Sequence, residues 1–174
     1  MGGKMKKDIN VRIISAIIAL ITVIPLIILG GIFFQLGVLV IGLLAYKEML
    51  DLKESHSKYP QAIIIIGVFW LFLLMLSNCM DYGLSYQILA MIFFTIILPI
   101  IFYKNDEYTF KDALWLIGIV LFLGIIFNLV IIVRDTSLML FLWLLIIPMV
   151  NDIFAYLIGS KFGKIKMCSR ISPN

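Results

Sequence analysis

An acidic side chain lies within the last apolar run of the chain. Asp152 follows residues 138–151, which contain no charged residue. An aspartate at the centre of a membrane helix costs about 2.5–3.5 kcal/mol on insertion scales, so an intramembrane carboxylate is a candidate functional residue. The alternative is a structural acid that hydrogen-bonds across a helix bundle to Asn128, Tyr156 or a neighbouring backbone. We predict that Asp152 has a catalytic role.

The spacing of polar and small residues extends this candidate site. Steps of three and four residues place Asp152, Tyr156, Gly159 and Gly163 on one face of a helix. Pro148 lies four residues before Asp152 and removes a backbone donor, which favours a kink. A kinked helix with an acid one turn later suits a cavity that water reaches. The two glycines also form a small-xxx-small pair, a pattern that ordinary close packing of helices explains equally well.

A basic segment follows the apolar run directly. It holds Lys161, Lys164, Lys166 and Arg170 within ten residues. Such clusters next to a membrane helix commonly contact anionic lipid headgroups. The sharper hypothesis is a phosphate site for a nucleotide or a phospholipid head, where the missing side chain of Gly163 allows a close approach.

Other kinds of site are excluded by the residue types present. The sequence has no P-loop, no Gly-x-Gly-x-x-Gly, no Ser-His-Asp set and no pair of histidines, which excludes the ordinary soluble nucleotide folds. His56 lies in a charged loop and is interpreted as a solvated residue. Cys79 and Cys168 are predicted to lie on opposite sides of a membrane, so we expect neither a disulfide nor a cysteine metal site.

The composition identifies the solvent of the elements that position this site. The chain is 63% hydrophobic and 14% charged, whereas soluble domains are about half apolar and about a quarter charged. Its apolar runs have no alternation and therefore predict membrane helices rather than membrane strands. We predict an all-α polytopic transmembrane helical bundle that forms a single domain over residues 1–174. Its six expected spans are residues 11–29, 32–46, 61–79, 84–103, 113–133 and 138–158.

The distribution of basic residues predicts the orientation of the bundle. Of the 14 Lys and Arg residues, all except Arg134 fall in segments that the six spans place on one side. Loops rich in Lys and Arg face the cytosol, so we predict that both termini are cytosolic. Gly30 and Gly31 join the first two spans in a tight hairpin on the outer side. The first half of the loop 47–59 is expected to continue the second helix as a polar end.

The residues from Asp152 to Pro173 resemble a known family. They read D-x-x-A-Y-x-x-G-x-x-F-G-K-x-K-M-x-x-R-I-S-P and are similar, without a gap, to a stretch of the phosphatidate cytidylyltransferases, also called CDP-diacylglycerol synthases. The resemblance covers the whole chain but only about the first two thirds of the family's length, without the family's C-terminal catalytic signature. The departures from the family pattern are Asn151, Ile153, Ser160, Ile165 and Cys168-Ser169.

The resemblance implies a transfer of CMP from CTP to phosphatidic acid, with Mg²⁺ as the cofactor. It implies that Asp152 contributes to a polar cavity or metal region, that Lys164, Lys166 and Arg170 face phosphates, and that Ser172 lines the nucleotide site. The metal ligands are expected beyond Asn174, so residues 1–174 alone are expected to be inactive. The implied partners are CTP, phosphatidic acid and membrane lipid, with no nucleic acid, and a homodimer is left open. The implied location is the bacterial cytoplasmic membrane, with the active face in the cytosol.

Two alternatives remain open from the sequence. One is a related lipid enzyme, such as a CDP-archaeol synthase or a polyprenol kinase-like protein. The other is a non-enzymatic membrane bundle or transporter. Transporters tend to show repeated halves with broken helices, and no such repeat is visible in this sequence.

Overall fold

The described part of the chain is helical. The computed structural model describes residue 14 and residues 18–52, 59–77, 85–103 and 107–162, with side chains described as far as Gly159. No strand occurs among these residues, which confirms the predicted all-α class. The elements in chain order are a first helix, Ile18–Leu29, then α2 Gly31–Asp51, α3 Gln61–Met75, α4 Tyr86–Ile97, the 3-10 helix η2 Leu98–Ile101, α5 Phe110–Thr136 and α6 Leu138–Phe162.

Helices occur at all six predicted positions, but only some of these helices are long enough to span a membrane. Three are long and apolar enough to cross a membrane, namely Gly31–Asp51, Phe110–Thr136 and Leu138–Gly159. The first helix, α3 and α4 with η2 are apolar but shorter. In α4 the reason is Pro99, which lacks a backbone donor and lies where the α-helix gives way to η2. The predicted count of six full spans is therefore not confirmed.

Several predicted helix boundaries differ from those in the structure. The second helix continues to Asp51, as expected for the first half of the loop that follows it. The fifth begins three residues earlier than predicted, because Thr109 and Asp112 form a capping box at its start. The Thr109 amide donates to Asp112 Oδ2 at 3.0 Å, and the Asp112 amide donates to Thr109 Oγ1 at 3.3 Å. Hydropathy alone does not register such a cap.

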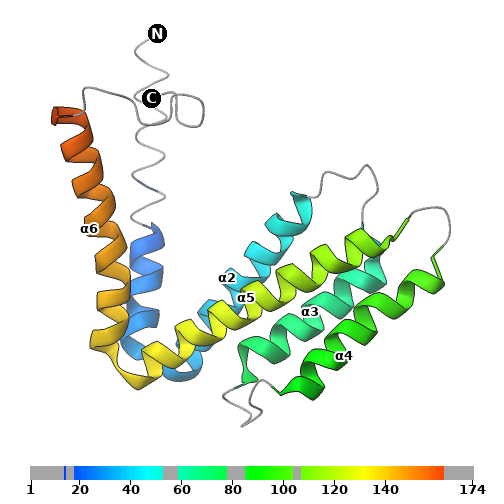
Figure 1. Ribbon diagram of the computed structural model, residues 1–174. Coiled ribbons are helices and arrows are strands. Elements are labelled where there is room, and N and C mark those ends of the chain that lie inside the picture. Colours follow the sequence, from blue (N-terminus) through cyan, green and yellow to red (C-terminus); the bar gives the residue numbers. More distant parts are fainter. Residues whose placement is uncertain (1–13, 15–17, 53–58, 78–84, 104–106, 163–174) are drawn as a thin grey trace.

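Three helices, α2, α3 and α4, form a bundle around α5. This helix packs against α2, α3 and α4, and α3 also packs against α4 (Figure 1). Gly42 of α2 lies against Met75 of α3, and Gly124 of α5 lies against Leu74 of α3, so missing side chains allow close contact between helices. The core residues that are less than 2% exposed include Ile63, Leu71, Leu74, Met75, Ile92, Ile96, Leu116, Val120 and Ile131.

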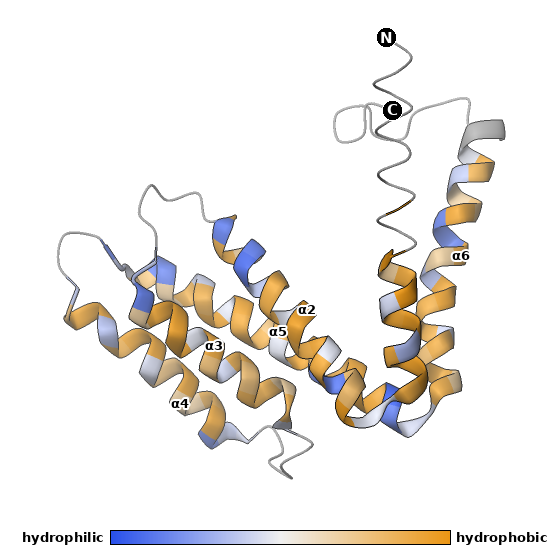
Figure 2. Ribbon diagram, turned by 180° about the vertical axis from the view of Figure 1, so that it is seen from behind, coloured by the Kyte–Doolittle hydropathy of each residue, from blue (hydrophilic) through white to orange (hydrophobic). Residues whose placement is uncertain are grey.

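The first helix and α6 diverge from this bundle. In Figure 1 both helices rise from the lower end of α5, while the bundle extends away from them. Phe141 is the one buried residue of α6 among those whose exposure is described. The remaining apolar side chains of α6 are exposed over its length, as the orange ribbon in Figure 2 indicates. Such a surface suits hydrocarbon rather than water.

Successive helices alternate in direction, as the predicted topology requires. The hairpin at Gly30 and Gly31, the end of α3 and the junction of α5 with α6 lie toward one end of the molecule in Figure 1. The ends of α2, η2 and α6 lie toward the other end. Both hairpin glycines have positive φ, 66° and 51°, a region that side chains disfavour. The orientation of the molecule relative to the cytosol stays a prediction.

Candidate functional site

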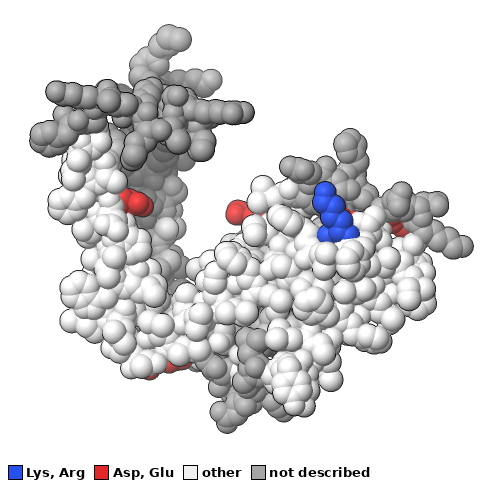
Figure 3. Space-filling view, in the orientation of Figure 1, with Lys and Arg blue, Asp and Glu red and all other residues white. Residues whose placement is uncertain are grey.

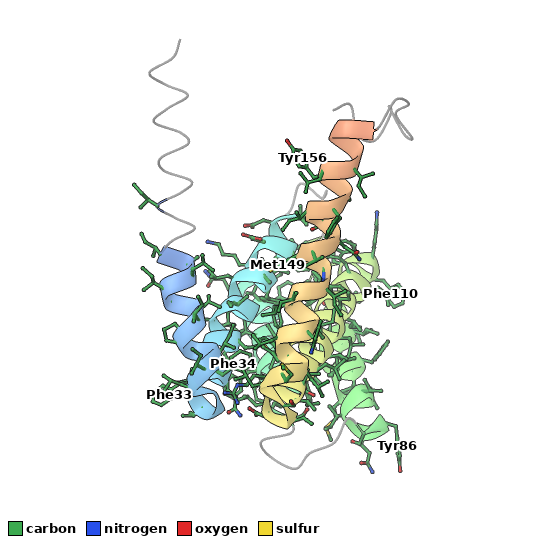
Figure 4. The ribbon with its side chains drawn as sticks, turned by 90° about the vertical axis from the view of Figure 1, so that its left-hand side faces the viewer. Phe33, Phe34, Tyr86, Phe110, Met149 and Tyr156 are labelled. Atoms are coloured by element: carbon green, nitrogen blue, oxygen red, sulfur yellow. The ribbon has the colours of Figure 1, made fainter. Side chains whose placement is uncertain are left out.

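The predicted acidic residue lies on the surface of α6. Asp152 is exposed, and so are Tyr156 and Gly159 on the same helix face. Figure 4 shows Tyr156 near the far end of α6, past Met149 along the helix. Pro148 is inside the helix, as expected, and helical structure continues through it. The structure therefore confirms that these residues share a helix, and the catalytic role of Asp152 stays a prediction.

The structural explanation of Asp152 finds no support among the described residues. Asn128, which the sequence offered as a partner, is buried in α5 and donates from Nδ2 to the carbonyl of Met75 at 3.1 Å. None of the side-chain hydrogen bonds or ion pairs between described residues involves the carboxylate of Asp152. A Cβ atom on Gly159 would meet nothing within 4 Å, so close helix packing does not explain that glycine in the described structure either.

The basic half of the predicted site lies outside the described residues. This holds for Gly163, Lys164, Lys166, Arg170 and Ser172. The proximity of these residues to Asp152 is therefore untested. Across the described residues, no group of three His, Cys, Asp or Glu side chains is placed to hold a metal ion. Asp152 alone does not make a magnesium site, because Mg²⁺ requires a near-octahedral set of oxygen ligands.

A second polar cluster lies at one end of the bundle, near the start of α5. The sequence interpretation missed it. Tyr59 and Tyr108 are 6% and 2% exposed, and their ring centroids are 6.3 Å apart. Asp112 is buried beside them at the start of α5. The pKa of the Tyr59 hydroxyl is raised by burial and then by the charge of Asp112. The pKa of the Tyr108 hydroxyl is raised by burial and then by Tyr59 and Asp112.

The hydrogen bonds of this tyrosine cluster indicate a structural role. Tyr59 donates to the carbonyl of Asp112 at 3.2 Å, and Tyr108 donates to the carbonyl of Ile96 at 2.8 Å. Each hydroxyl thus satisfies a backbone carbonyl on another element, as buried polar groups require. The Thr-x-x-Asp spacing before an apolar run is the sequence signal that points to the cap within this cluster.

These features define a class of protein. The chain is a membrane protein that is helical in its described part, and the one carboxylate on α6 is exposed and precedes a basic segment of the sequence. A model of the cytidylyltransferase family matches residues 10–174, which is nearly the whole chain. The chain belongs to this family.

Curated bacterial proteins are similar to the chain over the same length. A phosphatidate cytidylyltransferase of Staphylococcus aureus is 28% identical over 166 residues, and one of Staphylococcus epidermidis is 30% identical over 171 residues. Each match covers 95% of this chain and 64% of the relative, so the chain spans about two thirds of the length of these relatives. No solved structure matches the chain significantly.

Proposed function

We propose that the chain is part of a phosphatidate cytidylyltransferase. The enzyme would transfer CMP from CTP to phosphatidic acid and release pyrophosphate. A phosphate oxygen of phosphatidic acid attacks the α-phosphorus of CTP, and the bond between that phosphorus and the β-phosphate oxygen breaks. The observation that carries this proposal is the match to the cytidylyltransferase family over residues 10–174, supported by relatives named for this activity.

The position of Asp152 suits chemistry at the edge of a bilayer. It lies ten residues before the end of α6, which is about 15 Å of helix at 1.5 Å per residue. That depth places a carboxylate below the headgroups but within reach of water that enters from the basic end. We assign to Asp152 the polar contact nearest the reacting groups, because no partner in the described structure explains its presence in an apolar helix.

The basic segment suits the substrates by charge. CTP and phosphatidic acid both present phosphates, and Lys164, Lys166 and Arg170 follow the membrane helix directly. Charge-assisted hydrogen bonds from such side chains hold phosphate oxygens more strongly than neutral ones do. Their contribution to phosphoryl transfer would be positioning and stabilisation of developing charge. We assign Ser172 to the nucleotide side of the same site.

Magnesium is the cofactor that the family resemblance implies. The described residues do not fit a magnesium site, since no three candidate ligands lie together among them. We therefore assign no residue of the described structure as a metal ligand and derive no step through a metal ion.

The proposed location is a bacterial cytoplasmic membrane, with Asp152 nearer the cytosolic side. The support is the concentration of Lys and Arg in segments at the ends of α2, η2 and α6, together with bacterial relatives. Arg134 is the exception and lies at the opposite end of the helices. Cytosolic orientation is required for access to CTP.

A chimeric enzyme tests the proposed activity. Residues 1–174 replace the matched part of the Staphylococcus aureus relative, whose remaining third is kept. Membranes that contain the chimera are supplied with phosphatidic acid, radiolabelled CTP and Mg²⁺, and the lipid product is separated. We expect CTP-dependent formation of CDP-diacylglycerol well above membranes without the chimera.

The controls separate a wrong function from a poorly assembled chimera. The parent relative is assayed at an equal amount of membrane-inserted protein, and CTP is replaced by ATP in a parallel reaction. A chimera that is inserted and monodisperse but yields no CDP-diacylglycerol, while its parent does, contradicts the proposal. Preferential use of another nucleotide or of a polyprenol acceptor would favour the related lipid enzymes instead.

A further inference from the structure

Arg134 ties the end of the first helix to the end of α5. Its Nε donates to the carbonyl of Ile27 at 3.0 Å, and its Nη2 donates to the carbonyls of Ile27 and Ile28 at 2.9 Å and 3.0 Å. The Arg134 side chain is only 15% exposed. Carbonyls in the last turn of a helix have no partner within that helix, and a cation there also interacts favourably with the helix dipole. One guanidinium therefore caps a helix that is far away in sequence.

Gly30, in the hairpin, leaves room for this guanidinium because it has no side chain. Gly30 has φ 66° and ψ −158°, a backbone conformation that is essentially restricted to glycine. A Cβ atom on Gly30 would overlap the guanidinium carbon and both terminal nitrogens of Arg134. Gly31, by contrast, has open space where a Cβ atom would lie. The contact thus depends on one glycine and one arginine that are distant in sequence.

The same guanidinium also contacts the start of α2 and, through it, α6. The Arg134 guanidinium carbon lies 5.9 Å from the centre of the Phe34 ring, which is buried in the first turn of α2. Phe34 meets Phe141 of α6 edge to face, with ring centroids 5.3 Å apart. We call Ile27, Gly30, Phe34, Arg134 and Phe141 the joint. Four helices meet there.

Apart from the joint, α6 has little support in the described structure. Ser137 alone separates α5 from α6, and Phe141 is the one buried α6 residue whose exposure is described. Asp152 lies 11 residues beyond Phe141, which is about 16 Å of helix. A tilt of about 10° at the joint would displace a residue at that distance by roughly 3 Å. Displacements of this size are large for a group that must meet a substrate.

We infer that Arg134 is a positioning residue that sets the direction of α6, and hence the place of Asp152, relative to the bundle. Its neighbours Asp135 and Gln35 contribute less. Asp135 Oδ1 lies 3.8 Å from Arg134 Nη1, and Gln35 Nε2 donates to Asp135 Oδ2 at 3.4 Å on the exposed side. The inferred effect on α6 stands on geometry alone, and only its importance for catalysis rests on the proposed function.

Distances between spin labels test this inference in the whole 174-residue chain. In a background with Cys79 and Cys168 replaced by serine, one label pair joins α6 to the bundle through Ile158→Cys and Lys47→Cys. A second pair stays within the bundle through Lys47→Cys and Phe102→Cys. All the labelled positions are exposed. Both pairs are measured in lipid nanodiscs by pulsed electron paramagnetic resonance, so no catalytic activity is needed.

Two independent changes at the joint are expected to move α6. Arg134→Ala removes the bonds to the carbonyls, and Gly30→Ala displaces the guanidinium while leaving the arginine in the chain. Each should shift or broaden the α6-to-bundle distance distribution by roughly 3 Å or more and leave the pair within the bundle unchanged. Arg134→Lys keeps the charge but not the forked geometry, so its α6-to-bundle distance distribution should lie between those of the unmodified chain and Arg134→Ala. Gly31→Ala and Asp135→Ala are the matched controls.

The results that overturn the inference are specific. An unchanged α6-to-bundle distribution in both Arg134→Ala and Gly30→Ala would show that the joint does not set the direction of α6. Equal broadening of both label pairs would show that Arg134 supports the whole fold rather than this helix. Failure of the chimeric enzyme to make CDP-diacylglycerol would leave these distances unaffected, so the two proposals fail separately.

Discussion

The bundle and α6 bury their residues to very different extents although both are strongly apolar. In an 18-residue apolar stretch long enough to cross a membrane, 44% of the α5 residues are buried, against 6% of those in α6. Polar residues in the bundle are paired: Trp70 donates to Thr95 at 2.8 Å, and Asn128 donates to Met75. Asp152 on α6 is exposed. In Figure 3, the described surface shows few charged atoms among the white ones.

This contrast separates polar residues that hold the fold from one that does not. A polar group inside a membrane is stable when its hydrogen bonds are satisfied, and the bundle residues meet that condition. Their presence needs no explanation beyond structure. Asp152 lacks a described partner, and a lone carboxylate in an apolar helix is costly. The comparison therefore directs the search for chemistry away from the bundle and toward α6.

The largest expected effect is on activity at α6. Asp152→Asn in the chimeric enzyme should reduce the rate of CDP-diacylglycerol formation by about 100-fold or more, since removing one preorganised polar group from an active site costs roughly that much. The unfolding of the protein should be unchanged, because no described residue depends on this carboxylate. Turnover and resistance to unfolding in detergent are measured on the same preparation.

Asp112→Asn is the matched change in the bundle. Asp112 is buried and belongs to the capping box of α5, so its replacement should lower stability by about 0.5–2 kcal/mol. Its turnover per folded molecule should stay within severalfold of the unmodified chimera. If Asp112→Asn removes activity while Asp152→Asn does not, the assignment of roles to the two regions is reversed.

Replacing a large apolar side chain by alanine gives the next largest difference in stability between the bundle and α6. Leu116 of α5 is fully buried, whereas Ile147 of α6 is 55% exposed. Leu116→Ala should destabilise the bundle by about 1–3 kcal/mol through lost packing, which is less than in water because lipid also solvates leucine. Ile147→Ala should change stability by less than about 0.5 kcal/mol. Equilibrium unfolding in mixed micelles measures both, and equal losses would mean that α6 is packed as tightly as the bundle.

Two glycines of α5 sharpen the same contrast within one helix. A Cβ atom on Gly124 would lie 2.7 Å from Leu74 Cβ, whereas one on Gly118 would meet nothing within 4 Å. Gly124→Ala should therefore cost about 1–3 kcal/mol by overpacking the contact with α3. Gly118→Ala should be neutral or slightly stabilising, because alanine favours the helix. The same unfolding assay applies, and a neutral Gly124→Ala would indicate that α3 and α5 are not in close contact.

The sequence predicted the fold class and the positions of the helices well, because hydrophobic runs directly report the length of chain that prefers lipid. It could not show that the fourth run is broken at Pro99 or that the fifth begins at a cap, since both depend on local hydrogen bonds. It placed Arg134 correctly at the end of the helices opposite Lys47 and Lys111, which lie near the end of α2 and the start of α5. Nothing in the spacing revealed that its guanidinium reaches Ile27, more than one hundred residues earlier.

The candidate site was predictable only in part. Asp152 is conspicuous because a charge in an apolar run can be read from the sequence. Tyr59, Tyr108 and Asp112 were missed, because residues in loops and at helix ends gain their burial only when distant helices assemble around them. The phosphate-binding role of the basic residues from Lys164 to Arg170 was inferred from their clustering and from the family resemblance, and these residues lie outside the described part of the chain.

The tyrosine cluster predicts a loss of bundle stability in alkali. The pKa values of Tyr59 and Tyr108 are raised in the folded state by burial and nearby charge. The stabilisation is complete below about pH 10, the ordinary tyrosine pKa, and is lost as the pH rises above it, because the unfolded chain then releases these protons first. Unfolding measured between pH 9 and 11 should show the decrease. The double variant Tyr59→Phe, Tyr108→Phe should have a flatter pH dependence, and an identical slope would exclude the cluster as its source.

The smallest expected effect comes from the buried amide of the bundle. Asn128→Leu removes the bond to the Met75 carbonyl but keeps a side chain of similar volume, so it should cost about 0.6 kcal/mol, the average for hydrogen bonds between membrane helices. The matched change on α6 is Asn151→Leu, at an exposed position. We expect no loss of stability there, because leucine is well solvated by lipid. A larger loss for Asn151→Leu than for Asn128→Leu would mean that α6 has a packed polar contact at that position, and the distinction between the two regions would then fail where it is most directly measured.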